Sequence, residues 1–158
     1  MDYSFIIRKA VKEDAADIQN ILHHAFEAYK IAAQITSPLA AMEESIESIE
    51  DDIANKDVFI ALMDNIPVGT VRVSPIDSET ALLTRLGVVP FNQNIGIGKS
   101  LINLVDKVAA ENKYKRIHLY TGTKNSDLIR FYYSRGFYID STSKDRGYVR
   151  ALLIKEYK

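Results

Sequence analysis

At 158 residues, of which 47% are apolar and 26% charged, the chain has the composition of one soluble globular domain over residues 1–158. Its net charge of −1 excludes a strong field for nucleic acid or an anionic membrane, and the lack of cysteine excludes disulfides, thiolate metal ligands and a cysteine nucleophile. Because no apolar run approaches the roughly 20 residues that cross a bilayer, we expect a cytoplasmic protein, and the sequence indicates no metal site.

The first third of the chain predicts one strand and two amphipathic helices, with a break between the helices. Apolar spacing places the strand over residues 5–10, the first helix over 14–29 and the second over 43–52. The break, residues 30–42, contains Ser37-Pro38 and has no sustained period, so we expect a loop or broken helix there. Segments of this kind often border a substrate site.

The second predicted helix is strongly acidic. Ile46, Ile49 and Ile53 predict its buried stripe, and the acidic residues would then form an outer face. Such a face is usually a solvated helix surface, and attraction of a cationic substrate is the alternative. The acidic residues are Glu43, Glu44, Glu47, Glu50, Asp51 and Asp52.

The middle of the chain predicts a meander followed by a crossover. Three apolar runs are separated by short turns, a pattern typical of antiparallel strands. These strands cover residues 58–63, 68–73 and 80–89. A helix over 97–112 then leads to a strand over 116–121, and a right-handed crossover of this kind sets its two strands parallel.

The last part of the chain predicts a helix and a hairpin. The helix begins at Asn125 and ends at Gly136, a glycine suited to a left-handed cap. Strands over 137–141 and 148–154 follow, joined by a turn at Asp145-Arg146-Gly147. Together the elements predict an α/β protein with one mixed sheet and helices on both faces.

The turn from Gln93 to Ser100 is the strongest functional signal. Its glycines let a ligand approach the backbone closely, and the first N–H groups of the next helix are available to an anion. Gly98-Lys99-Ser100 resembles the end of a P-loop, but Gln93 stands where that motif needs glycine, and a dinucleotide fingerprint would need glycine at Leu101. The pattern that remains is Gln-x-x-Gly-x-Gly, formed by Gln93, Gly96 and Gly98 between a strand and a helix. The alternative interpretation is a tight turn before an ordinary helix, without a bound anion.

Two motifs in this sequence resemble those of the GNAT N-acetyltransferase superfamily. The first is Leu86-Gly87-Val88-Val89-Pro90 leading into Gln93, Gly96 and Gly98, and the second is Asn125 followed by Phe131-Tyr132-Tyr133 and Gly136-Phe137. Their order, with a strand between them, and the element order of nearly the whole chain match the family. The resemblance implies the GNAT acyl-CoA N-acyltransferase fold, which has a largely antiparallel N-terminal meander, a parallel splayed strand pair and flanking helices.

The resemblance also implies a site for acetyl-CoA. Backbone groups of Leu86 and Val88 would pair with the pantetheine arm, which acts as a false strand between diverging parallel strands, and Asn125 would contact the pantetheine side. Asn94 stands where relatives usually have glycine, and asparagine tolerates left-handed conformations better than most residues. The implied cofactor-binding residues are Leu86, Gly87, Val88, Gln93, Asn94, Ile95, Gly96, Ile97, Gly98, Lys99, Ser100 and Asn125. Of these, Gln93, Asn94, Gly96, Gly98, Lys99 and Ser100 would surround the diphosphate.

The implied reaction is direct acetyl transfer from acetyl-CoA to a primary amine in a ternary complex, the acceptor being an unidentified small molecule or peptide. Tyr132 would donate a proton to the departing thiolate, with a packed core aromatic as the alternative reading. A backbone N–H near Val88 would polarise the thioester carbonyl. Two rival functions are a non-catalytic acyl-CoA-binding sensor and, less favoured, a P-loop-like phosphotransferase using Gly98-Lys99-Ser100.

The general base is not identified by the sequence. Many relatives have a carboxylate on the strand before the glycine turn, but the residues here are Thr84 and Arg85. Glu79 lies far toward the strand start, His118 and Tyr120 share one face of the next strand, and a relayed water is equally compatible. The binding site for the acceptor would be formed by residues 30–42, the acidic helix and the hairpin around Arg146. The last strand could pair across a homodimer or stay inside one subunit.

Overall fold

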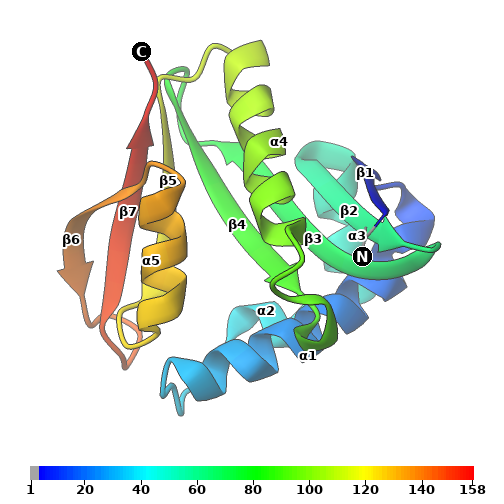
Figure 1. Cartoon of the computed structure of the whole chain (residues 1–158), viewed down its shortest axis with the longest axis horizontal. Coiled ribbons are helices and arrows are strands. Elements are labelled where there is room, and N and C mark those ends of the chain that lie inside the picture. Colours follow the sequence, from blue (N-terminus) through cyan, green and yellow to red (C-terminus); the bar gives the residue numbers. More distant parts are fainter. Residues whose placement is uncertain (1–3) are drawn as a thin grey trace.

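The computed structural model describes residues 4–158 and orders them around one sheet (Figure 1). Its strands are β1 (Phe5–Lys9), β2 (Asp57–Met63), β3 (Ile66–Pro75), β4 (Thr80–Val88), β5 (Arg116–Gly122), β6 (Tyr138–Ser143) and β7 (Arg150–Glu156). Its helices are α1 (Ala15–Ala32), α2 (Ala40–Glu43), α3 (Ile46–Asn55), α4 (Ile97–Glu111) and α5 (Ser126–Ser134), with short 3-10 turns at η1 (Lys12–Asp14) and η2 (Pro90–Asn92).

The sheet has the order β1-β2-β3-β4-β5-β7-β6, and its one parallel pair among the described strands is β4 with β5. That pair is short, because only Thr80–Leu82 of β4 align with Arg116–His118 of β5. Beyond these residues the two strands diverge, as Figure 1 shows. The predicted mixed sheet with an antiparallel meander and a splayed parallel pair is therefore confirmed.

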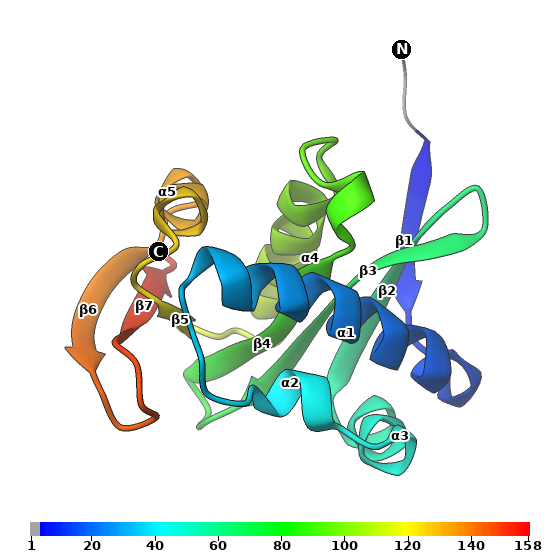
Figure 2. The ribbon, with the colours of Figure 1, turned by 90° about the horizontal axis from the view of Figure 1, so that it is seen from below.

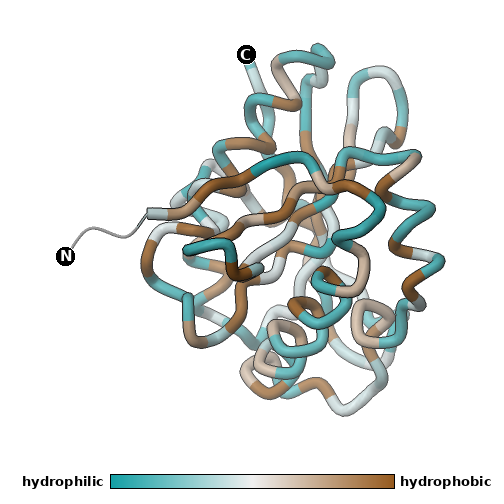
Figure 3. Tube along the Cα trace, turned by 90° about the vertical axis from the view of Figure 1, so that its right-hand side faces the viewer, coloured by the Kyte–Doolittle hydropathy of each residue, from teal (hydrophilic) through white to brown (hydrophobic). Residues whose placement is uncertain are grey.

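Helices cover both faces of the sheet. α1, α2 and α3 lie on one face and α4 and α5 on the other (Figure 2). Alternation along each strand sends side chains to both layers: Val71 and Val73 pack in the core beneath α4, whereas Val58 and Ile60 pack with α1 and α3. Figure 3 shows the resulting pattern, with hydrophobic residues concentrated along the strands and polar residues recurring along the outer sides of the helices.

The segment predicted as a loop or broken helix, residues 30–42, contains the end of one helix and a short second one. α1 continues to Ala32, and α2 occupies Ala40–Glu43. Ala33, Ile35 and Leu39 form a small buried cluster against Tyr148. The connection between the helices is therefore anchored against the C-terminal hairpin.

The prediction for the acidic helix was partly wrong. The helix begins at Ile46 rather than at residue 43, because the Ser45 hydroxyl accepts the N–H of Ser48 at 3.1 Å and caps it. Glu44 and Asp52 also do not belong to an outer face, since both bind the buried guanidinium of Arg72. A buried cation needs carboxylate partners, and this requirement turns two of the six acids inward.

The C-terminal elements follow the prediction with a small shift. Asn125 caps α5 by accepting the N–H of Leu128 at 3.3 Å, and Gly136 follows the helix with a φ of 98°, as expected for a left-handed cap. β6 and β7 begin one and two residues later than predicted and extend to Ser143 and Glu156. Their connecting turn contains Asp145-Arg146-Gly147 as predicted, and Gly147 has a φ of 83°.

Candidate functional site

A cavity of about 890 Å³ lies where β4 and β5 diverge. Its walls come from β4, β5, α5, the turn before α4, the end of α1 and the β6–β7 turn. The volume lies within the range of small-molecule and cofactor sites, about 300–1,000 Å³. Ten of the predicted site residues line this cavity: Leu86, Gly87, Val88, Gln93, Asn94, Gly96, Gly98, Lys99, Asn125 and Tyr132.

Three predicted site residues lie outside the cavity lining, namely Ile95, Ile97 and Ser100. Ile97 is 1% exposed, and its side chain packs against β3 at Gly69, so that it fastens the turn to the sheet. Ile95 packs partly against the same core. Ser100 donates its N–H to the carbonyl of Gly96 at 3.0 Å and so makes the first hydrogen bond of α4.

The turn before α4 has the backbone that an anion site requires. Asn94 has a φ of 67° and Gly96 a φ of 94°, both in the left-handed region. The asparagine in place of a glycine is thus accommodated as expected. Because Ser100 makes the first helical bond, the N–H groups of residues 97–99 precede the α4 ladder and remain available to a ligand at the positive end of the helix dipole.

Gly98 leaves room at this turn. A Cβ at Gly98 would meet no protein atom closer than the Phe131 ring at 3.5 Å, which is ordinary contact. The protein itself therefore does not need glycine at this position. A ligand that approaches the α4 backbone at Gly98, as a diphosphate would, does need it.

β4 contains a bulge at the edge of the cavity. Arg72 of β3 pairs with Thr84, and Thr70 pairs with Gly87, so β4 has one extra residue between these pairs. Arg85 takes up the irregularity with a φ of 56°. A bulge turns a side chain out of the regular alternation, and here the Arg85 Nε donates to Glu44 at 3.1 Å while the residue lines the cavity.

Tyr132 is both packed in the core and part of the cavity wall. Its ring packs edge-on against Phe131 and Phe137, with centroids 5.4 and 5.7 Å away, and the residue is 5% exposed. The residue also lines the cavity. Burial, with a smaller contribution from Tyr29, raises the pKa of Tyr132 above its usual value, so the phenol keeps its proton at neutral pH.

The candidate bases lie in different places. Glu79 forms ion pairs with Lys115 and Arg116, at 3.5 and 3.8 Å, and lies outside the cavity lining, as His118 does. Tyr120 lines the cavity, and the Arg150 guanidinium stacks 4.6 Å above the centre of its ring.

Sequence reasoning missed several residues of the cavity wall. Tyr29 of α1 accepts the N–H of Gly122 at 2.6 Å, and Tyr148 and Arg150 line the same wall. Tyr29 is the last residue of the first predicted helix, where its apolar spacing indicates only a packing role. Its position near the end of that helix, just before a segment expected to border the substrate, was the one available signal.

Residues 4–158 show neither a metal-binding group nor a membrane-spanning helix. No group of three or more His, Asp or Glu residues in this part of the chain is arranged to hold a metal ion. None of the helices described combines the length and the apolar character needed to cross a membrane.

Comparison with known proteins identifies the family. The model described as "Acetyltransferase (GNAT) family" matches residues 17–137. A comparison with curated proteins gave no match. Among solved structures, the PaiA N-acetyltransferase of Thermoplasma acidophilum in complex with coenzyme A has a TM-score of 0.85 and 24% identity, covering 98% of this chain and 99% of that one.

Two further solved structures contain acetyl-CoA. YncA of Salmonella typhimurium, a putative acetyltransferase, has a TM-score of 0.76 and 17% identity over 98% of this chain and 95% of its own. A GNAT family acetyltransferase of Elizabethkingia anophelis has a TM-score of 0.69 and 20% identity over 97% and 98%. At such identities the likeness shows a common fold, and the family model covers most of the chain. The protein described here therefore belongs to the GNAT acetyltransferase family.

Proposed function

We propose that the protein transfers an acetyl group from acetyl-CoA to a primary amine by direct attack in a ternary complex. The observation that carries the proposal is the cavity between the diverging β4 and β5, which has the N-terminus of α4 at its rim and Tyr132 in its wall. Family membership supports acyl transfer, and the relatives solved with coenzyme A or acetyl-CoA support the choice of donor.

The pantetheine arm would lie along β4. Register with β5 ends at Leu82, so in the part of the chain that the structure describes, β4 from Leu83 onward faces β5 without pairing. An extended arm with amide groups can use such an edge as an added strand. Leu86 and Val88 would supply its backbone partners, and Asn125 would contact the arm from the start of α5.

The diphosphate would bind at the turn from Gln93 to Ser100. N–H groups of residues 97–99 and the α4 dipole favour negative charge there, and Lys99 lies in the cavity wall beside them. Gln93 already donates its side-chain amide to the carbonyl of Val88 at 3.1 Å, which ties the turn to the end of β4.

We expect Gly98→Ala to separate ligand binding from stability. The added methyl meets Phe131 at ordinary contact distance, so the free energy of unfolding should stay unchanged or rise by up to about 1 kcal/mol. Affinity for CoA, measured by calorimetry, should fall by about tenfold or more, because the methyl occupies the approach to the backbone. Gly96→Ala provides the contrast in stability. Because Gly96 has a φ of 94°, an alanine there should strain the backbone and lower the free energy of unfolding. Equal CoA affinity of Gly98→Ala and wild type would contradict the placement of the diphosphate.

The transfer step follows from the chemistry of the thioester. The neutral amine attacks the carbonyl carbon, the C–N bond forms, and the C–S bond breaks with its electron pair leaving on sulfur. An N–H near Val88 would stabilise the oxyanion, and Tyr132 would donate its hydroxyl hydrogen bond to the thiolate. The attacking nitrogen loses its extra proton to water or to a base.

The pH profile should reflect the amine rather than an enzyme carboxylate. Lysine-like amines have a pKa near 10.4, so kcat/KM should rise with pH as the acceptor loses its proton. Since burial raises the pKa of Tyr132, loss of its proton should cause no fall in rate up to about pH 10. A bell-shaped profile with a descending limb between pH 7 and 9 would contradict this assignment.

The test of the proposed function is a panel of amines assayed by free-thiol release from acetyl-CoA, preceded by calorimetry with CoA alone. Binding of CoA and turnover with some amines are expected. CoA binding without turnover on any amine would favour the non-catalytic sensor. Thermal protection by ATP and magnesium but not by CoA would favour the phosphotransferase.

A further inference from the structure

Three arginines line the cavity. Among the described residues that line it, the charged side chains are Arg85, Lys99, Asp127, Arg146 and Arg150. Lys99 and Asp127 belong to the first turns of α4 and α5, where the donor would bind. The remaining charges, all positive, come from β4, the β6–β7 turn and the start of β7.

Two of these arginines lie on the face of the sheet opposite α4. Leu119 and Ala151 pack in the core beneath α4, so their strand neighbours Tyr120 and Arg150 lie on the other face, where they stack at 4.6 Å. Arg85 shares Glu44 with Arg72, which alternates with the core valines Val71 and Val73 and so lies on that other face as well.

Arg150 has hydrogen-bonding capacity that the protein leaves unused. Its side chain is 11% exposed, and its Nη2 lies 3.4 Å from Asp145, whose carboxylate is 62% exposed. Its Nε is buried and has no hydrogen-bond partner among the described residues. Buried donors are nearly always paired in folded proteins, and Arg150, unlike Arg72 with its own unpaired Nε, lines the cavity, where a ligand could accept from its guanidinium.

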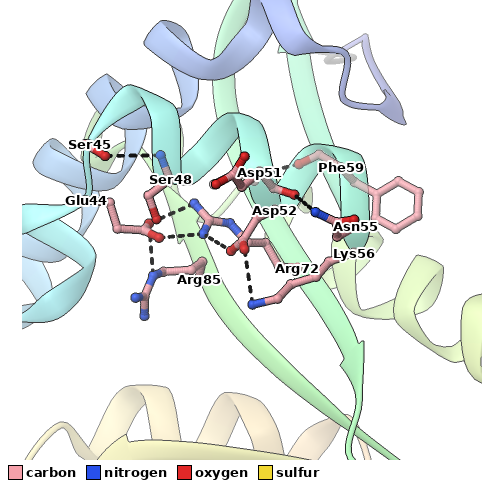
Figure 4. A network of polar contacts seen from close by, with 11 residues as sticks. Glu44, Ser45, Ser48, Asp51, Asp52, Asn55, Lys56, Phe59, Arg72 and Arg85 are labelled. Atoms are coloured by element: carbon pink, nitrogen blue, oxygen red, sulfur yellow. Dashed lines mark hydrogen bonds and ion pairs between the residues drawn. The ribbon is translucent and has the colours of Figure 1, made fainter.

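Arg85 also keeps a positive charge for the cavity. Its Nε binds Glu44, and the terminal nitrogens point away from that carboxylate in Figure 4. Glu44 and Asp52 are shared with Arg72 and Lys56. Two carboxylates against three cations leave this network one positive charge, and Arg85 is the member of the network that lines the cavity.

Arg146 completes the cluster from the β6–β7 turn. This turn is held in place, because Gly147 lies against the Ser37 hydroxyl, 3.0 Å from where a Cβ would stand, and Tyr148 packs on Ile35 and Leu39. The α1–α2 connection and the C-terminal hairpin therefore form one wall, with Arg146 at its surface.

We propose that the acceptor is an amine that also carries a carboxylate, and that Arg85, Arg146 and Arg150 bind this carboxylate. The proposal rests on the proposed acetyl transfer and names its acceptor class. Arginine suits a carboxylate because its planar donors pair with both oxygens. The same charges disfavour an ammonium ion and so promote the neutral amine. Asp127, the one carboxylate among the described lining residues, belongs to the first turn of α5. A polyamine without a carboxylate would be repelled.

The test compares matched acceptors. L-amino acids, their α-amides and the diamine putrescine are assayed by thiol release, and their binding to the CoA-loaded protein is measured by calorimetry. We expect kcat/KM and affinity to be at least about tenfold higher for acids than for the matching amides. Arg150→Met and Arg146→Met should remove most of this preference, while the affinity for CoA stays at the wild-type value.

Lys144→Met is the control, since Lys144 lies on the same turn, is exposed and stands outside the cavity lining. It should keep the preference for acids. Equal use of acids and amides, preference for putrescine, or a preference retained in both arginine variants would overturn the inference while leaving acetyl transfer intact. Failure to bind CoA would instead overturn the proposed function, and the acceptor titration without CoA would then still show whether the arginines select carboxylates.

Discussion

Replacing Tyr132 by Phe is expected to lower kcat for acetyl transfer by about 10²- to 10⁴-fold, the range typical of a lost proton donor. The affinity for CoA should stay near the wild-type value. Phe keeps the ring that packs against Phe131 and Phe137 and removes only the hydroxyl oxygen. The change therefore tests the hydroxyl rather than the packing of α5.

The physical reason lies in how charge develops on sulfur. A thioester sulfur is a weak acceptor, whereas a departing thiolate is a strong one, so a hydrogen bond from Tyr132, as proposed, would strengthen in the transition state and lower the barrier. Burial raises the pKa of Tyr132, which keeps the phenol protonated and makes a full transfer to sulfur costly. We therefore infer that Tyr132 acts chiefly as a hydrogen-bond donor to the thiolate. The thiolate would take a proton from water when CoA leaves the site.

The control for this prediction is Tyr133→Phe. Tyr133 is the next residue of α5, is 50% exposed and stands outside the cavity lining, so its variant should turn over at the wild-type rate. Both proteins are compared at saturating acetyl-CoA and acceptor, after calorimetry has shown that CoA binds. A Tyr132→Phe enzyme with the wild-type kcat would remove Tyr132 from the mechanism and leave it a core aromatic.

The fold was predictable where the signal was local. Apolar alternation identified the meander, and the helix between β4 and β5 required the parallel crossover. Gly136 and Asn94 marked left-handed positions that the backbone adopts. One wall of the cavity was predictable for the same reason, since a strand, a glycine turn and a helix start lie in one stretch from Leu86 to Ser100.

The opposite side of the cavity was not predictable, because it is assembled from distant segments. Tyr29, Arg85 and Arg150 belong to three different elements, and no short motif joins them. The periodicity of the sequence likewise could not predict that Glu44 and Asp52 turn inward to bind Arg72. It identified Ile49 and Ile53 as the inner face of α3, although Ile46 of the predicted stripe is exposed. It did not identify the buried arginine, which lies between two core valines of β3 and binds both carboxylates.

Replacing Glu44 by Ala is expected to destabilise the fold by about 3 kcal/mol, at the lower end of the range for breaking a buried ion pair. Glu44 accepts two hydrogen bonds from Arg72 at 2.8 Å and one from Arg85 at 3.1 Å (Figure 4). Arg72 is 1% exposed, and its Nε is already unpaired. Without Glu44, Asp52 alone would face the buried charge, at 2.8 Å.

The measurement is urea unfolding at pH 7, with Glu47→Ala as the surface control. Glu47 is an exposed acid in the first turn of α3, and its loss should change stability by no more than about 0.5 kcal/mol. The double variant Arg72→Met with Glu44→Ala should lose less than the sum of the single variants, because removing the cation removes the uncompensated charge. Additive losses would mean that the two residues stabilise the fold through separate packing contacts. Glu44 also holds Arg85, which lines the cavity. A non-additive loss would therefore mean that the same carboxylate both stabilises the fold through Arg72 and positions a charged residue of the cavity wall.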